Sequence, residues 1–242
     1  MIRAVERIVS RMLRRPSSVS FGDLRRVTPL SREFGFDRGA PVDRRYIEGF
    51  LARHAADVRG RVLEVKDAAY TRRFGGARVE VSDVLDVDAT NPDATLIDDL
   101  TTGAQLPSDA FDCVVLTQTL HLIFDVHAAA RTLHRTLKPG GVLLLTVPGI
   151  TQIPRVESSS WYWSFSCLAA ERLFRGAFAG GTVDVAWHGN VLAATAFLYG
   201  LAERELRDHE LDANDPDYPV TITVRAVKGG APRVADGGAR VG

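Results

Sequence analysis

Five short apolar segments follow one another between residues 60 and 148, separated by turn-forming or helix-forming stretches. They are rich in β-branched residues and mostly apolar throughout, as are strands that are buried on both faces of a parallel sheet. The segments are RVLEV (61–65), RVEVSD (78–83), ATLIDD (94–99), FDCVVLTQ (111–118) and GVLLLTVP (141–148). Their alternation with helices predicts an α/β fold built on a doubly wound, mostly parallel sheet.

The rest of the chain completes this pattern. A helix is predicted from Asp43, its expected N-cap, to Val58, and residues 125–141 form a helix ended by Pro139 and Gly140. After the fifth strand we expect a helix at 168–178, a strand at 182–188 (TVDVAWH), a helix at 191–205 and a last strand at 219–227 (PVTITVRAV). The sheet therefore has seven strands.

Three regions are expected along the chain. Residues 1–42 form a covering segment that starts with a basic amphipathic helix ended by Pro16 and continues irregularly, residues 43–228 form the domain, and residues 229–242 form a disordered tail. Residues 1–45 hold eleven arginines against five acidic residues. The basic helix either packs on the domain or a partner, or lies on a membrane surface.

Composition narrows the function classes. The chain has 242 residues, 45% of them hydrophobic, and a formal net charge of +0, so no overall charge points to nucleic acid. Cys113 and Cys167 are too few for a disulfide framework or a cysteine-based zinc site, and no HxxxH or CxxC spacing suggests another metal. Without a long apolar run or a signal-peptide core, a cytoplasmic location is expected.

A stretch of 39 residues carries a family resemblance. FDCVVLTQTLHLIFDVHAAARTLHRTLKPGGVLLLTVPG (111–149) strongly resembles the fourth strand, helix and fifth strand of class I S-adenosylmethionine-dependent methyltransferases, most specifically from LPSDAFD (106–112) to LKPGG (137–141). The resemblance covers about residues 44–227. The stretch FGFDRGAPVDRRYIE (34–48) is similar to a group of bacterial methyltransferase-like proteins, some of them found beside or fused to glycosyltransferases.

The resemblance implies a cofactor site at the carboxyl ends of the strands. Glu64 matches the acid that helps position the methionine part of S-adenosylmethionine, and Asp83 matches the acid that holds the ribose hydroxyls, with Asp86 as a competing register. Asp99 and Leu100 match the adenine contact, and Thr117 and Gln118 lie beneath the cofactor. Each acid also has a structural alternative, in which Glu64 caps a helix or pairs with an arginine and the aspartates form turns.

The sequence departs from the family at the glycine loop. Lys66, Ala68 and Tyr70 stand where glycines normally allow a positive φ and a close approach of the ligand. Because each non-glycine residue in the left-handed region costs about 1–2 kcal/mol, we expect a different loop conformation. Lys66, which we group with Asp67 among the cofactor-binding candidates, either grips the carboxylate of the cofactor, receives another anion, or has no ligand role.

Two histidines are candidate bases for methyl transfer. His121 lies just beyond the fourth strand and His188 follows the sixth, and an imidazole titrates near neutral pH. Alternatively, His121 is a helix-start residue that faces solvent or packs under the loop, and His188 is structural.

Two groups of residues are candidates for binding the methyl acceptor. Trp161, Tyr162 and Trp163 follow the fifth strand, and aromatic surfaces there suit a sugar ring or a flat natural product, unless they form a lid on the core. Asp37, Arg38, Arg44 and Tyr46 form the other group, which can equally be an ion-pair network.

Short connections leave one sheet face poorly covered. About twelve residues join the first two strands and ten follow Asp83 before Ala94, too few for full crossover helices. We expect residues 1–42 or a second subunit to cover that face, so the candidate partners are a second copy or a glycosyltransferase.

Three functions stay open at this point. The leading hypothesis is O-methylation of a sugar-containing or secondary-metabolite molecule with S-adenosylmethionine. The others are a catalytically degenerate partner-binding subunit and the same fold used for a reaction other than methyl transfer.

Overall fold

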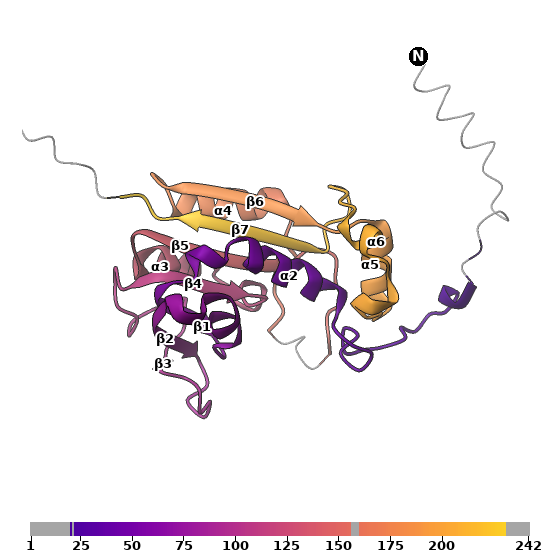
Figure 1. Cartoon of the computed structure of the whole chain (residues 1–242), viewed down its shortest axis with the longest axis horizontal. Helices are drawn as coiled ribbons and strands as arrows, with labels where there is room; N and C mark the ends of the chain where they lie inside the picture. The colour runs from indigo at the N-terminus through magenta and orange to yellow at the C-terminus, as the bar shows by residue number, and fades with distance from the viewer. Residues whose placement is uncertain (1–19, 21, 156–159, 231–242) are drawn as a thin grey trace, which may run out of the picture.

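The computed structural model of this chain describes residues 20, 22–155 and 160–230. The basic helix expected before Pro16 and the tail from residue 231 onward lie outside the described residues. Within them, the chain folds into a sheet with helices on both faces, and the segment before α2 runs along one end of it (Figure 1).

The sheet has the predicted seven strands. The parallel strands are β3, β2, β1, β4 and β5 in spatial order, followed by β7, which is antiparallel to both of its neighbours, and by β6 at the edge. Their bounds are β1 Gly60–Val65, β2 Val79–Asp86, β3 Leu96–Ile97, β4 Phe111–Thr117, β5 Leu137–Pro148, β6 Thr182–His188 and β7 Thr221–Val227. This mostly parallel, doubly wound sheet confirms the predicted fold class.

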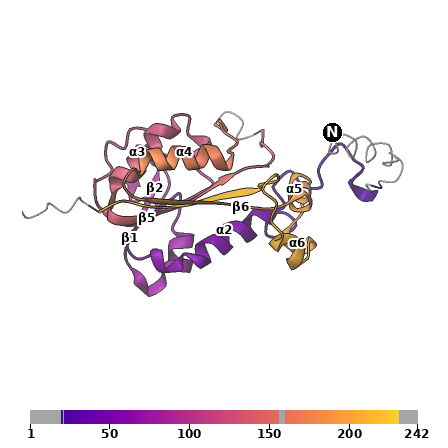
Figure 2. The ribbon, with the colours of Figure 1, turned by 90° about the horizontal axis from the view of Figure 1, so that it is seen from above.

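Helices α3 and α4 cover one face of the sheet (Figure 2). Their apolar sides place Leu133 and Phe174 among Val114 and Leu143 in the largest cluster of buried residues, where all four side chains are fully buried. The helices of the described chain are α2 Val42–Arg53, α3 Val126–Thr136, α4 Cys167–Ala177, α5 Val191–Leu198 and α6 Asp208–Asp212, with α5 and α6 beyond one end of the strands.

Helix α2 covers the opposite face. Ile47 and Leu51 are fully buried against Val62, Cys113 and Leu144 of the central strands. The cover that we expected from residues 1–42 or from a second subunit is therefore supplied here by the first helix of the domain itself. Residues 30–41 lie elsewhere, along the end of α5, where the amides of Leu30 and Ser31 donate to the carbonyl of Tyr199.

The first crossovers are as short as the spacing predicted. Between β1 and β2 the chain makes a π-helix, Thr71–Gly75, and one 3-10 turn, and only turns join β2 to β3. Three predicted helices are shorter than expected. Helix α3 ends at Thr136, and Pro139 and Gly140, its expected stop, belong to β5. Helix α2 ends at Arg53 rather than Val58, and α5 ends at Leu198 because Gly200 takes a left-handed φ of 72°.

Candidate active site

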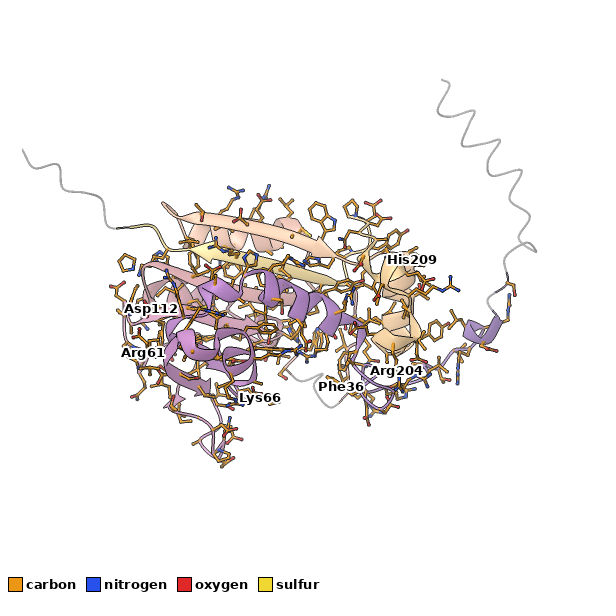
Figure 3. All side chains as sticks on the ribbon, in the orientation of Figure 1. Phe36, Arg61, Lys66, Asp112, Arg204 and His209 are labelled. Atoms are coloured by element: carbon orange, nitrogen blue, oxygen red, sulfur yellow. The ribbon has the colours of Figure 1, made fainter. Side chains whose placement is uncertain are left out.

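A cavity of about 1650 Å³ opens at the carboxyl ends of β1, β2 and β4. The sheet creates it because neighbouring parallel strands end together there and the chain leaves in different directions. Figure 3 labels Lys66 and Phe36, which reach it from parts of the chain thirty positions apart. The predicted site residues that line it are Glu64, Lys66, Asp67, Asp99, Leu100, Thr117, Gln118, His121 and Trp161.

The loop after β1 keeps one of the three left-handed positions that glycines would favour. Lys66 has a φ of 77°, held by a 2.9 Å hydrogen bond from its amide to the carbonyl of Leu85, whereas Tyr70 is right-handed with a φ of −75°. Ala68 has no positive φ either, and its side chain is buried away from the cavity lining. The conformational cost of the loop therefore arises at Lys66 alone and is about 1–2 kcal/mol.

Glu64 is committed to the loop that follows it. Its two carboxylate oxygens accept hydrogen bonds from the amides of Tyr70 (3.1 Å) and Thr71 (2.7 Å), the first residues of the short helical segment. Burial raises the pKa of Glu64, and these amide bonds oppose the rise. The capping alternative therefore describes this carboxylate, although Glu64 also borders the cavity.

Asp83 does not line the cavity, and the ribose role expected of it stays a prediction. Strand β2 continues three residues beyond Asp83, which is paired instead with Arg61, Oδ2 to Nε 2.7 Å. The strand ends at Asp86, the competing register, which does line the cavity. Its carboxylate accepts from the amide of Asp88 at 3.0 Å and from Nδ2 of Asn91 at 2.6 Å.

Turns hold the other two predicted acids of the cavity, Asp67 and Asp99, in place. Asp67 accepts from the amide of Ala69 and Asp99 from the amide of Thr101, both at 2.7 Å. At the end of β4, Gln118 takes a left-handed φ of 46°. These local bonds hold the strand ends in place without using the whole hydrogen-bonding capacity of the carboxylates.

The two candidate bases lie in different places. His121 is buried at the cavity, its ring centroid 4.1 Å from that of Trp161, and burial lowers its pKa to about 4. His188 does not line this cavity, because β6 ends on the far side of α2, where its ring stacks on Tyr46. Burial, aided by Arg53, lowers the pKa of His188 to about 4, so the structure gives it a packing role.

Asp37 and Arg38 also lie outside the cavity. The Asp37 carboxylate accepts a hydrogen bond from Ser31 within its own loop, and Arg38 pairs with Glu205, Nε to Oε2 3.0 Å. The ion-pair interpretation therefore applies to Arg38, whereas Asp37 is held by a hydroxyl group, and contact of either residue with the acceptor stays a prediction.

Tyr46 and Trp163 are likewise structural. The buried Tyr46 hydroxyl donates to the carbonyl of Leu211 at 3.1 Å, and burial raises its pKa to about 12. The indole of Trp163 donates to the carbonyl of Ile123 at 3.0 Å, and Trp163 is not among the residues that line the cavity. Of the aromatic triplet, Trp161 and Tyr162 line the cavity.

Several lining residues were not among the predicted site residues. Asp43 is not the N-cap of α2, because the helix begins one residue earlier with Pro41 in that position. Its carboxylate lines the cavity beside Arg44, whose guanidinium donates to the Tyr70 hydroxyl at 3.0 Å. The signal for them was the stretch 34–48, which carried a resemblance of its own and also supplies Phe34 to the cavity.

The comparison with family models decides the affiliation. A model described as a methyltransferase domain matches residues 28–177, which include α2, the cavity loops and the sheet as far as β5. The chain belongs to the methyltransferase domain family. Comparison with curated protein sequences finds no match.

Solved structures share the fold of this methyltransferase-family chain. An S-adenosylmethionine-dependent methyltransferase from Mesorhizobium loti is 18% identical, with 78% of this chain and 99% of that chain covered and a TM-score of 0.53. The [4+2]-cyclase SpnF is 15% identical over 77% and 82%, with a TM-score of 0.51. A possible exported protein from Bordetella parapertussis is 15% identical over 93% and 79%, with a TM-score of 0.51. At these identities the likeness concerns the fold alone.

The described part of this methyltransferase-family chain has neither a metal-binding group of side chains nor a membrane-spanning helix. Its histidine, cysteine and acidic side chains form no group of three or more arranged to hold a metal ion. Within the same residues, no helix is long and apolar enough to cross a bilayer.

Proposed function

We propose that this protein binds S-adenosylmethionine and transfers its methyl group to a hydroxyl of a small molecule, of the sugar-containing or secondary-metabolite class. The observation that carries the proposal is the cavity itself, which lies at the carboxyl ends of the strands in a chain of the methyltransferase domain family. The cofactor supplies an electrophilic methyl group on a sulfonium, and the protein has to hold both reactants in line.

The residues in the half of the cavity beside β1 and β2 suit the charged, hydroxyl-bearing and flat parts of this cofactor. The exposed ammonium of Lys66 has no ion-pair partner among the described residues and suits the carboxylate of the methionine part. Asp86 retains lone pairs for the ribose hydroxyls, since a carboxylate has about four acceptor sites. The buried Leu100 offers an apolar contact for adenine, and Asp99 lies beside it.

The other half suits an acceptor with apolar surface. Trp161 and Tyr162, after β5, line it together with Phe34 and Phe197. Aromatic side chains pack well against sugar rings and flat ring systems. This lining supports a small-molecule acceptor over a polymer that would need an open groove.

Calorimetry with S-adenosylmethionine and S-adenosylhomocysteine tests the proposal. We expect saturable binding, weakened by about tenfold or more in Lys66→Ala because a charge-assisted hydrogen bond is lost. Lys66→Gly should weaken binding equally, since it lacks the same ammonium, but should relieve the strain of the left-handed position. Lys138→Ala, whose ammonium pairs with Asp112 at the other end of the sheet, is the matched control.

The outcomes separate the competing functions. Absence of heat and of any thermal shift with millimolar ligand would overturn the proposal in favour of a partner-binding domain. Binding without methyl transfer to any hydroxyl acceptor would favour a non-methylating reaction, as the name of the cyclase SpnF illustrates for another protein of this fold. Unchanged affinity in Lys66→Ala would remove the role of that lysine alone.

A further inference from the structure

Three residues that line the same cavity each carry a buried polar atom that has no hydrogen-bond partner among the described residues. They are Asp43 at Oδ1, His121 at Nδ1 and Trp161 at Nε1, from the start of α2 and from the loops after β4 and β5. Buried polar groups are nearly always hydrogen-bonded, because leaving one without a partner destabilises the fold. Their convergence on one cavity indicates a polar ligand group that satisfies them.

The hydrogen-bonding characters of the three atoms are complementary. A carboxylate oxygen only accepts, an indole N–H only donates, and the Nδ1 of a neutral imidazole does either, depending on its tautomer. A hydroxyl group both donates and accepts, so its chemistry suits the Asp43 carboxylate as well as the His121 and Trp161 rings. The rings of that pair are 4.1 Å apart between centroids, close enough to face one ligand group.

The surroundings of these atoms are apolar and flat. Phe34 is stacked on Trp161, with 6.5 Å between ring centroids and 15° between planes, and Phe197 lies against Phe34 at 5.9 Å. Phe36, Phe124 and Tyr162 add three more aromatic rings to the lining. With about 1650 Å³, the cavity exceeds the roughly 300–1,000 Å³ of ordinary ligand pockets, which leaves room for a ring system beside the cofactor.

Burial moves the two ionisable groups in opposite directions. It raises the pKa of Asp43, against the opposing charge of Arg44, and it lowers the pKa of His121 to about 4. A general base works best when its pKa lies near the working pH. His121 therefore stays neutral at physiological pH as a hydrogen-bonding group, and the Asp43 carboxylate is the group that we assign as proton acceptor.

We propose that the methyl acceptor is a hydroxyl group on a flat apolar ring system, that His121 and Trp161 orient this hydroxyl, and that Asp43 removes its proton. The inference rests on the proposed function and deepens it. As the acceptor oxygen forms its bond to the methyl carbon, the carbon–sulfur bond breaks and its electron pair stays on sulfur. The hydroxyl proton passes to Oδ1 of Asp43, so that the products are a methyl ether, a neutral thioether and a protonated carboxyl group.

Binding of 2-naphthol without cofactor tests the recognition step. The wild-type protein should bind this probe and change its tryptophan fluorescence on doing so. Asp43→Ala should bind it about tenfold more weakly, and Trp161→Phe, which keeps a ring but loses the N–H, several-fold more weakly. Asp208→Asn, an exposed acid that contacts α2 only through Arg45, should not change the affinity. No binding by the wild type, or equal binding by all four proteins, would overturn the assignment.

A pair of acceptor probes tests the proton transfer. 2-Naphthol needs a base at mildly alkaline pH, whereas 4-nitrophenol is already ionised there. In the presence of S-adenosylmethionine, Asp43→Asn should lose about 10²–10⁴-fold of the turnover with 2-naphthol and far less with 4-nitrophenol. Equal losses with both probes would show a merely structural role, and no methylation of bound 2-naphthol by the wild type would overturn the proposal.

Cofactor binding is measured on the same proteins to keep the two proposals apart. Asp43→Asn should bind S-adenosylhomocysteine as the wild type does. If the wild type does not bind it, the proposed function fails, while the naphthol result still decides whether the cavity recognises an aromatic hydroxyl.

Discussion

Lys66 and Gln118 hold strained backbone at the ends of two adjacent strands. Both are non-glycine residues with positive φ, 77° and 46°, and both line the cavity. Each is held by an amide hydrogen bond to the neighbouring strand, to Leu85 at 2.9 Å and to Thr146 at 3.0 Å. Strain of this kind persists where the surrounding structure over-determines it and is concentrated at functional sites. The backbone thus turns toward the cavity at the ends of β1 and β4, and the positive φ at each turn costs stability.

Asp43 should make stability depend on pH. Its pKa is raised in the folded state by burial, while the charge of Arg44 lowers it and the Tyr70 hydroxyl lies near enough to respond to it. A carboxyl with a raised folded pKa binds its proton more tightly when folded, so its contribution is full below the ordinary value of 3.8 and is lost as the pH rises through the folded pKa.

The uncharged Asp43→Asn should therefore melt at a higher temperature than the wild type at about pH 8, with a gain of about 2–4 °C for each kcal/mol. The gain should disappear at about pH 3 to 4, where both proteins are uncharged at this position. Calorimetric melting curves at several pH values measure it, with Asp208→Asn as the control. A lower melting temperature than wild type at about pH 8 would contradict the raised pKa of Asp43.

The helical segment from Ala69 to Gly75 depends on one carboxylate. It is too short to bury an apolar face of the kind that stabilises α3, and Glu64 satisfies its first amides instead. The segment also carries Tyr70, whose hydroxyl accepts from Arg44. Glu64 therefore shapes the cavity by holding this segment in place, and it does so without a ligand.

Glu64→Gln should loosen that segment. The amide side chain can accept one of the two hydrogen bonds but presents an N–H to the other donor, so we expect a loss of about 1–3 kcal/mol in the free energy of unfolding. Urea unfolding measures the loss, and hydrogen exchange should show faster opening of residues 69–75. Gln118→Glu, at the same cavity but outside this cap, is the comparison variant. Unchanged exchange at 69–75 would show that the cap is dispensable.

Long-range contacts build the acceptor half of the cavity. Residues 30–41, here called the strap, run along residues 199–203, with the amides of Leu30 and Ser31 donating to Tyr199 and the carbonyl of Ala40 accepting from Glu203. The strap thereby carries Phe34 to Trp161 and leads directly into α2 and Asp43. Gly200 permits this approach, because a Cβ there would lie 2.4 Å from the carbonyl oxygen of Ser31.

Gly200→Ala should displace the strap. Besides the clash, alanine at a φ of 72° costs about 1–2 kcal/mol, so we expect lower stability and faster tryptic cleavage at Arg32 and Arg38. Binding of 2-naphthol should weaken, whereas binding of S-adenosylhomocysteine, on the other side of the cavity, should not. Gly176→Ala is the matched control, since its Cβ meets nothing within 4 Å in α4. Equal cleavage rates in the two variants would contradict the anchoring of the strap.

Local patterns in the chain were enough to predict the elements and their layering. The apolar strands, the helix after β4 and the short first crossovers all follow from periodicity and spacing, which act between near neighbours. The expected end of that helix at Pro139 and Gly140 was wrong, because it ends at Thr136 and both residues belong to β5. The carboxyl ends of the strands, and with them Lys66, Leu100, Gln118 and His121, could be assigned to one site because parallel strands end together.

Strand lengths and long-range packing decided the rest. Whether Asp83 or Asp86 ends β2 depends on a pairing with β1 that sequence spacing does not resolve within three residues. Asp43 is an expected N-cap in isolation, yet Pro41 takes that position and Asp43 lies in the first turn of α2, among the residues that line the cavity. Sequence thus determined the sheet and the end of it where the cavity lies, because those follow from contacts close along the chain. Only tertiary structure decided which side chains face the cavity, because that depends on segments more than a hundred residues apart lying against each other.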